Sequence, residues 1–364
     1  MTTLDRQLFF GYFRSYMIVL TSLLSLYVIV DLFTNLDDFS GRGGLVSMIR
    51  HIGTYYGYRI AQIFDKLSEA ISLLAAVFTV SWMQRSNELL PQLSAGVSTR
   101  RVIRPVILGA LITIAMGPIN QEFIIPQIAD ALTTPRNDPE ARRAVEIRGA
   151  FDGTGIHYEG VNAYRAEKRV EWVSVTFPEA GAGGMLHLSA AEAVFSPPQD
   201  SEPSGVWTLY RTTPATIEGP LPATLEPVSP GVFRLRLRDL DFETLTRGAQ
   251  WYAFASTPGL LDILARPDPR RQAAVAVLFH SRLVRPAVGL VLVLLGLGVI
   301  LGNQNRHVIV NVGLCVAMCA AYYATIYASK YLGDQDFIAP VLAAWLPVLI
   351  FGPLVVVLLD AVHT

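Results

Sequence analysis

Two clusters of ionisable residues interrupt otherwise apolar sequence. One contains Asp65, Lys66 and Glu69, which fall on neighbouring turns of an expected helix. The other contains Arg282 and Arg285, at the start of a later apolar stretch. Lys66 and Glu69 can pair locally, because residues three apart are neighbours on a helix surface. The arginines can snorkel to ordinary phospholipid headgroups, or they can face a cavity and bind phosphates of an anionic glycolipid, and the sequence leaves both open.

A polar segment at residues 84–105 separates two apolar stretches and reads QRSNELLPQLSAGVSTRRVIRP. Its first part is amphipathic, and a glycine, a serine and a basic cluster follow. The pattern predicts a short helix on the membrane surface that ends near Gly96 and restarts at Ser98. Glu88 in this helix is either an ordinary exposed carboxylate or a charge that fixes the register of a partner subunit.

The remaining reactive residue types favour structural roles. Cys315 and Cys319 lie four apart, on one helix face, which favours apolar packing over metal or redox chemistry. His157 and His187 fall in predicted strands without a third ligand, so we expect no metal site. Three tyrosines of one late apolar stretch either pack against other helices or line a lateral opening: Tyr322, Tyr323 and Tyr327.

Three sequence motifs of catalysis are missing from the chain. It has no phosphate-binding GxxxxGK[S/T] loop, no HExxH zinc-protease motif and no GxSxG nucleophile elbow. We therefore expect no catalytic residues and no cofactor. ATP hydrolysis that drives this chain would have to occur in a separate subunit.

The composition indicates which elements position these residues. Of 364 residues, 52% are hydrophobic and only 16% are charged, whereas soluble proteins average about 25% charged residues. This balance predicts a membrane protein. The net charge of −1 excludes a broadly basic nucleic-acid-binding protein.

Six apolar stretches are long enough to cross about 30 Å of hydrocarbon as helices. Three precede a long polar insertion and three follow it. The first is not followed by a small-x-small cleavage site, so we expect it to stay as an anchor. The six expected spans are Leu8–Phe33, Leu67–Met83, Val106–Ala129, Pro286–Asn305, Val308–Ser329 and Phe337–Leu359.

The spans predict three regions of the chain. Residues 1–132 hold the first three spans and the polar segment at about 84–104, residues 133–271 form the insertion, and residues 272–364 hold the last three spans. Three spans before the insertion place both termini on one side and the insertion on the other. Seven Lys and Arg residues in short loops on the side of the termini, against four on the other side, favour cytoplasmic termini and an external insertion.

The insertion changes to a β pattern between Gly155 and Asp241. Short runs of Val, Ile, Tyr, Trp and Phe alternate with polar residues and are separated by Pro and Gly clusters. The run FRLRLR at residues 233–238 places an apolar row and a basic row on opposite faces of a strand. The pattern favours an antiparallel sheet with a solvated face. An apolar trough that holds an acyl chain is the alternative.

Two motifs resemble those of a known family. Asn87-Glu88-Leu89 followed by Ala95-Gly96-Val97-Ser98 resembles the N-E-L … A-G-(I/V)-S signature of the LptF/LptG permease family, which exports lipopolysaccharide. The run HSRLVRP at residues 280–286 is similar to the Arg-x-x-x-Pro that begins the fourth span in that family. The order of three spans, an external β domain and three spans also matches, over essentially the whole chain.

The resemblance implies an α-helical polytopic membrane protein with six transmembrane helices and an inserted all-β, jellyroll-like periplasmic domain. It implies a non-enzymatic permease subunit of an ATP-binding-cassette exporter in the bacterial inner membrane. The cargo would be lipopolysaccharide or a related glycolipid, passed through the β domain toward the outer membrane. The implied partners are an ATPase subunit, a second six-helix permease subunit, paralogous or identical, and a periplasmic bridge protein.

The prediction assigns two groups of functional residues. Coupling to the ATPase is assigned to the polar segment, at Arg85, Asn87, Glu88, Leu89, Gly96 and Arg100. Contact with lipid is assigned to Arg282, Arg285, Tyr323 and Tyr327.

Two other classes of protein compete with this interpretation. A membrane-anchored sensor with an external β ligand-binding domain is the main alternative, and it would require a cytoplasmic output domain that the short ends do not provide. An intramembrane enzyme would require convergent polar residues within the spans, and the apolar stretches offer few.

Overall fold

The computed structural model describes residues 3–39, 44–133, 144–147, 149–180, 184–198, 205–217, 219, 221–237, 240–246, 251–265, 272–302 and 308–361. The chain forms two compact units. The helical unit contains residues 1–132 and 252–364, and the β unit contains residues 133–251. Residues 252–265, which the sequence groups with the insertion, therefore belong with the helices.

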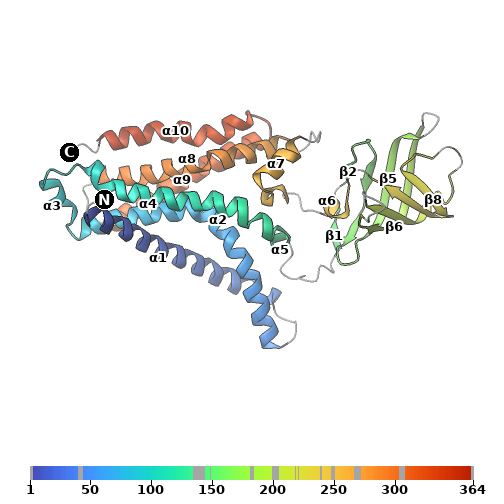
Figure 1. Ribbon diagram of the computed structural model, residues 1–364, viewed down its shortest axis with the longest axis horizontal. Helices are drawn as coiled ribbons and strands as arrows, with labels where there is room; N and C mark the ends of the chain where they lie inside the picture. The colour runs from blue at the N-terminus through green and yellow to red at the C-terminus, as the bar shows by residue number, and fades with distance from the viewer. Residues whose placement is uncertain are drawn as a thin grey trace. The chain divides into compact units, whose positions relative to one another are not determined.

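The helical unit contains four helices that are long and apolar enough to cross a membrane, counting only the described residues (Figure 1). They are α1 (Thr3–Thr34), α4 (Thr99–Ile119) with the π-helical turn η2 (Asn120–Ile124), α8 (Gln272–Gly302) and α10 (Pro340–Ala361). The other two expected spans lie within α2 (Leu45–Arg85) and α9 (Val308–Asp334). The shorter elements are η1 (Leu36–Asp38), α3 (Leu89–Ser94), η3 (Pro126–Ile128), α5 (Ala129–Thr133), η4 (Trp251–Phe254) and α7 (Thr257–Leu264).

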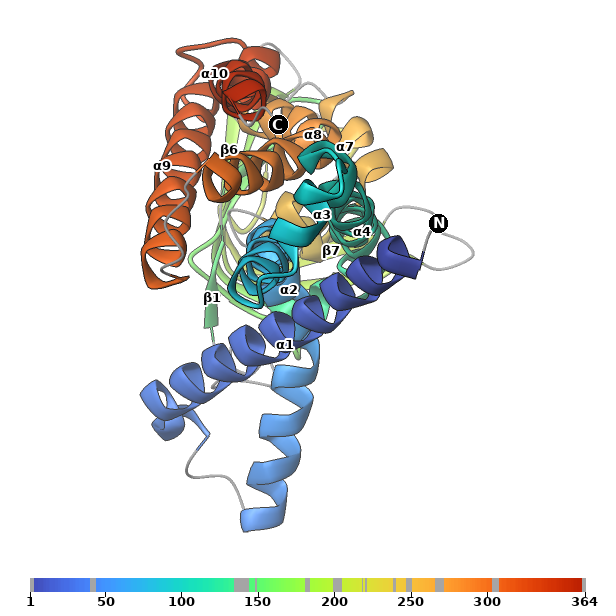
Figure 2. The same cartoon turned by 90° about the vertical axis from the view of Figure 1, so that its left-hand side faces the viewer.

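The C-terminal part of helix α2 packs against α1, α4 and α8, whereas its N-terminal part extends away from the other helices (Figure 2). Its Leu73 and Val77 are fully buried, as are Leu292 and Leu295 of α8. Gly296 of α8 faces Leu73 so closely that any side chain there would collide with it. Small residues at a helix contact let the backbones approach, and this explains why α2 and α8 pack tightly.

A buried hydroxyl cluster joins three of these helices. The Tyr12 hydroxyl of α1 and the Thr113 hydroxyl of α4 lie 2.7 Å apart, and the Ser72 hydroxyl of α2 lies 3.0 Å from that of Thr113. A Cβ at Gly109 would approach the Tyr12 ring to 2.5 Å. The glycine therefore makes room for the ring, and the hydroxyls satisfy one another inside an apolar environment.

The β unit contains nine described strands in one antiparallel sheet, in the order β1-β4-β5-β6-β7-β9-β8, with β3 joining β2 to β5. The strands are β1 (Ala144–Glu146), β2 (Ala150–Phe151), β3 (His157–Glu159), β4 (Asn162–Tyr164), β5 (Arg169–Ala180), β6 (Gly184–Ser196), β7 (Val206–Thr213), β8 (Leu225–Ser229) and β9 (Val232–Arg236). A short helix, α6 (Phe242–Thr246), follows them. The predicted antiparallel sheet is confirmed.

Strand β9 shows the predicted alternation. Phe233 and Leu235 are buried, whereas Arg234 between them is exposed. Strand β8 lies in one of the Pro- and Gly-rich stretches that separate the strand-like runs, so the sequence pattern did not indicate it. Arg236 of β9 pairs with Glu226 of β8 at 2.7 Å on the exposed face, so an acidic neighbour balances part of the basic row.

The core of the β unit is built around Trp207, which is fully buried. Its ring contacts those of Tyr158, Phe195 and Phe242 at centroid distances of 4.8, 5.0 and 6.2 Å. Its indole N–H donates to the carbonyl of Leu240 at 3.1 Å. Burial raises the pKa of the Tyr158 phenol well above its usual value, so the hydroxyl stays neutral in this core.

We expect Trp207→Phe to lower the free energy of unfolding of the β unit by about 1–3 kcal/mol, because the buried Leu240 carbonyl loses its donor. Pulse proteolysis of the full chain, with cleavage monitored in the β unit, measures this change. Tyr210→Phe is the matched control, because Tyr210 lies on the same strand and is exposed. Equal stabilities of the two variants would contradict the prediction.

Candidate functional site

The polar segment between α2 and α4 begins with a sharp helix end. Helix α2 ends at Arg85, and Asn87 adopts φ 57°, in the left-handed region. The Glu88 N–H donates to the Met83 carbonyl at 3.0 Å, and the Asn87 N–H donates to the Gln84 carbonyl at 3.3 Å. These two bonds form a Schellman cap, in which Asn is one of the few non-glycine residues that fits. Asn87 therefore has a structural role in the motif.

A second cap of the same kind ends α3. Gly96 has φ 77°. The Val97 N–H donates to the Gln92 carbonyl at 3.1 Å, and the Gly96 N–H donates to the Leu93 carbonyl at 3.0 Å. Ser98 then precedes the first residue of α4. The predicted helix end near Gly96 and restart at Ser98 are confirmed.

The two caps leave α3 with one anchored side and one exposed side. Leu89 and Val97 pack against a small core made by Leu8, Met83 and Val102, which come from α1, α2 and α4. Five of the six predicted coupling residues are exposed, and the sixth is Leu89. The exposed residues are Arg85, Asn87, Glu88, Gly96 and Arg100. Helix α3 is thus short and anchored, and exposed charged residues flank it on both sides, which are the features of a docking element.

Gly96→Ala is expected to lower the free energy of unfolding of the protein by about 1–2 kcal/mol, because alanine at positive φ is strained. Asn87→Gly is the matched variant at the first cap, and we expect it to be neutral or slightly stabilising since glycine adopts this conformation freely. Thermal unfolding and amide exchange of residues 84–98 measure both changes. A destabilising Asn87→Gly would show that the Asn87 side chain, and not its backbone, is required.

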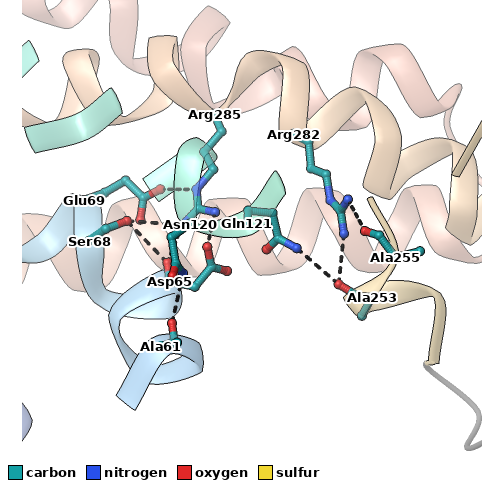
Figure 3. Close-up of polar contacts among 10 residues, drawn as sticks. All are labelled: Ala61, Asp65, Ser68, Glu69, Asn120, Gln121, Ala253, Ala255, Arg282 and Arg285. Carbon is teal, nitrogen blue, oxygen red and sulfur yellow. Dashed lines mark hydrogen bonds and ion pairs between the residues drawn. The ribbon is translucent and has the colours of Figure 1, made fainter. Parts of the chain in front are cut away.

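Arg285 lies in a buried cluster of charges between α2 and α8 (Figure 3). Its Nε donates to Glu69 Oε1 at 2.5 Å and its Nη1 donates to Asp65 Oδ1 at 2.7 Å. Its Nη2 donates to the Asp65 carbonyl and to the Ser68 hydroxyl, the latter at 3.1 Å. The side chains of Arg285 and Asp65 are each 16% exposed and that of Glu69 is 11% exposed. Glu69 thus pairs with a distant arginine, not with Lys66 as the sequence suggested.

Two glycines allow this cluster to form. A Cβ at Gly117 of α4 would lie 2.8 Å from the Ser68 hydroxyl and 3.4 Å from Arg285 Nη2. A Cβ at Gly289 of α8 would lie 3.3 Å from Cγ of Glu69. The helices therefore approach closely around the charges and exclude the surrounding solvent, which strengthens each ion pair.

Arg282 lies one helical turn from Arg285 and binds main-chain oxygens. Its Nη1 donates to the Ala255 carbonyl at 2.6 Å and its Nη2 donates to the Ala253 carbonyl at 2.9 Å (Figure 3). Gln121 of η2 lies between the clusters. The Gln121 amide is oriented so that its nitrogen and its oxygen each have a partner. The nitrogen donates to Asp65 Oδ2 at 2.8 Å, and the oxygen accepts from Arg282 Nη2 at 3.0 Å. Gln121 therefore links Arg282 to Asp65, which is a partner of Arg285.

Within the described residues, the three candidate tyrosines form no hydrogen bond to these arginines. The Tyr322 hydroxyl donates to the Val288 carbonyl at 2.8 Å, which is a packing contact between α9 and α8. The Tyr323 hydroxyl is buried without a partner among the described residues, and Tyr327 is 69% exposed. Within the described part of the chain, no group of His, Cys, Asp or Glu could hold a metal ion.

Sequence reasoning missed Gln121 and Glu122 as participants in the site. The Glu122 carboxylate accepts from the Thr257 N–H at 3.1 and 3.0 Å, at the beginning of α7. A signal was present, because polar residues near the end of an apolar span are expected to find partners. The partners themselves lie far away in sequence.

Residues 6–361 match the family model described as "Lipopolysaccharide export system permease LptF/LptG". A search of curated proteins gave no match. The match covers both units and includes the polar segment with its two caps.

Proposed function

Because the chain belongs to the LptF/LptG family, we propose that this transmembrane lipopolysaccharide export permease is one half of the membrane part of an ATP-binding-cassette exporter. The observation that carries the proposal is the family match over almost the whole chain, together with an anchored α3 that exposed charged residues flank. The chain would extract lipopolysaccharide or a related glycolipid from the inner membrane. Another subunit would hydrolyse ATP, consistent with the absence of a phosphate-binding loop from the sequence.

The proposal includes six membrane spans, made by α1, α2, α4, α8, α9 and α10. The arginine distribution supports cytoplasmic termini, so the β unit would lie in the periplasm as a jellyroll-like domain. There it would receive the lipid and pass it to a bridge protein toward the outer membrane. A second six-helix permease subunit, identical or paralogous, would complete the cavity.

Helix α3 would dock on the ATPase. Leu89 packs the helix against the small core, whereas Arg85, Glu88 and Arg100 are exposed, Arg100 in an ion pair with Asp360. Asn87 and Gly96 set the two turns that present the helix. Motion of the ATPase would then act on α2 and α4, because α3 connects directly to both.

Lipid contact would involve Arg282, Arg285, Tyr323 and Tyr327 in different ways. Tyr327 is exposed, so a lipid would reach it directly. Both arginines have internal partners, so a lipid phosphate would have to compete with Asp65 and Glu69 for Arg285 and with main-chain carbonyls for Arg282. Their contribution to lipid binding would therefore depend on rearrangement of α8.

Purification of the tagged chain from its native membrane in mild detergent tests the proposal, with mass spectrometry of co-purifying proteins and lipids. We expect an ATP-binding-cassette ATPase, a second six-span subunit and lipopolysaccharide. Recovery of the chain without an ATPase or sister subunit in several detergents would contradict the exporter and favour the sensor.

A further inference from the structure

The chain leaves the helical unit through η2, η3 and α5 and returns through η4 and α7. These outgoing and returning segments contact each other. The Glu122 carboxylate accepts the Thr257 N–H at 3.1 and 3.0 Å. The Gln121 amide oxygen accepts from Arg282 Nη2 at 3.0 Å, and the same nitrogen donates to the Ala253 carbonyl. A carboxylate at the start of α7 is stabilised by the positive end of the helix dipole. The two connections to the β unit are thus joined where they meet the helices.

Arg282 fixes the returning segment to α8. Its guanidinium binds two carbonyls, those of Ala253 and Ala255, at 2.9 and 2.6 Å (Figure 3). Ser256, the next residue, caps α7 by accepting the Gly259 N–H at 3.3 Å. A charged donor makes stronger hydrogen bonds than a neutral one, and burial strengthens them further. The start of α7 therefore has little freedom to move independently of α8.

The outgoing segment is fixed to α2 instead. Asn120 Nδ2 donates to the Ala61 carbonyl at 3.0 Å, and Arg59 Nη1 donates to the Leu132 carbonyl at 3.2 Å. Residues 120–124 are π-helical, a conformation that is frequent at functional sites. A shift of α8 relative to α2 would therefore strain the hydrogen bonds between the outgoing and the returning segment.

We propose that Arg282, Gln121 and Glu122 are positioning residues that form a clamp, through which movement of α8 and α2 is transmitted to both connections of the β unit. The inference rests on the proposed function as an exporter. It adds the route by which ATP-driven helix motion reaches the part of the chain that would receive the lipid. A bundle contact with a purely structural role would stabilise the helices without affecting the yield of transport per ATP.

The test uses Arg282→Met in the full chain, assembled with its ATPase and sister subunit in proteoliposomes. We expect the exchange rate of the Thr257 amide to rise at least tenfold. Lipopolysaccharide release per ATP should fall at least tenfold, because the helices move but the connections do not follow. Glu122→Gln, at a residue outside the assigned lipid contacts, should also lower release while ATP hydrolysis stays within twofold. Arg282→Lys keeps one charged donor and should restore release to within about threefold of the parent.

Arg14→Met is the matched control, because Arg14 is an exposed arginine of α1. It should change neither amide exchange nor release. If Arg282→Met does not fold, Glu122→Gln replaces it, since it keeps the side-chain shape but removes the charge at the start of α7. We expect a three- to tenfold rise in Thr257 exchange for this variant.

Three results would overturn the inference. They are unchanged exchange at Thr257, faster exchange with normal release per ATP, and a parallel loss of ATP hydrolysis and release that indicates a purely structural defect. Failure of the proposed function looks different, because the parent complex would then release no lipopolysaccharide. The exchange measurement needs no transport, so it would still decide whether the clamp holds the segment.

Discussion

Replacing Arg285 by methionine is expected to lower the free energy of unfolding of the protein by about 3–5 kcal/mol, because it leaves two buried carboxylates without their counter-charge. Asp65 and Glu69 each lie within 2.7 Å of the guanidinium and are mostly buried. Methionine fills a similar volume, so the loss is chiefly electrostatic. Unfolding of the purified chain in mixed micelles, followed as a function of denaturing detergent, measures the change.

A set of matched variants separates charge from packing. The triple variant Asp65→Asn, Glu69→Gln, Arg285→Met removes all three charges, and we expect it to recover most of the lost stability. Arg100→Met breaks the exposed ion pair with Asp360, 3.4 Å apart, and should cost less than about 1 kcal/mol. If the triple variant is as unstable as Arg285→Met alone, the defect lies in packing and the electrostatic account is wrong.

Glu88→Arg is expected to reduce lipopolysaccharide release by the reconstituted exporter at least tenfold, while the protein stays folded. The side chain is exposed at the start of α3, so its reversal changes the charge offered to a partner without disturbing the core. Release of lipopolysaccharide and ATP hydrolysis, measured on the same proteoliposomes, report the coupling. Thermal unfolding reports the fold.

Glu88→Gln is the control for this variant, because it keeps the size of the side chain and removes only its charge. We expect an intermediate loss of release. Arginine at a helix start also opposes the helix dipole, at a cost of about 0.3–1 kcal/mol, so unfolding is measured for both variants. Normal release by Glu88→Arg would disprove the coupling role of this residue.

Features that depend on local sequence were predictable. The end of α3 at Gly96 follows from the need for a residue at positive φ, and glycine satisfies it at no steric cost. The burial of Phe233 and Leu235 follows from the two-residue repeat of a strand. Both signals lie within a few residues of the feature that they predict.

The partners of Arg285 could not be predicted in the same way. Glu69 lies 216 residues earlier in the sequence, and the rotation of α2 and α8 about their axes decides whether the two side chains meet. From the sequence alone, the nearby Lys66 is the natural partner of Glu69, but Lys66 is exposed. Strand β8 was missed for a related reason, because Pro227 is compatible with a strand only at the edge of a sheet, and the sequence does not reveal which strand lies at the edge.

The contact of Arg282 with the carbonyls of Ala253 and Ala255 has an evolutionary consequence. Every amino acid carries a main-chain carbonyl. Substitution of the side chain at either of these two positions therefore keeps the carbonyl that Arg282 binds. Selection would act on one partner only, the arginine. A lineage could therefore remodel the surface of this segment without losing its attachment to α8.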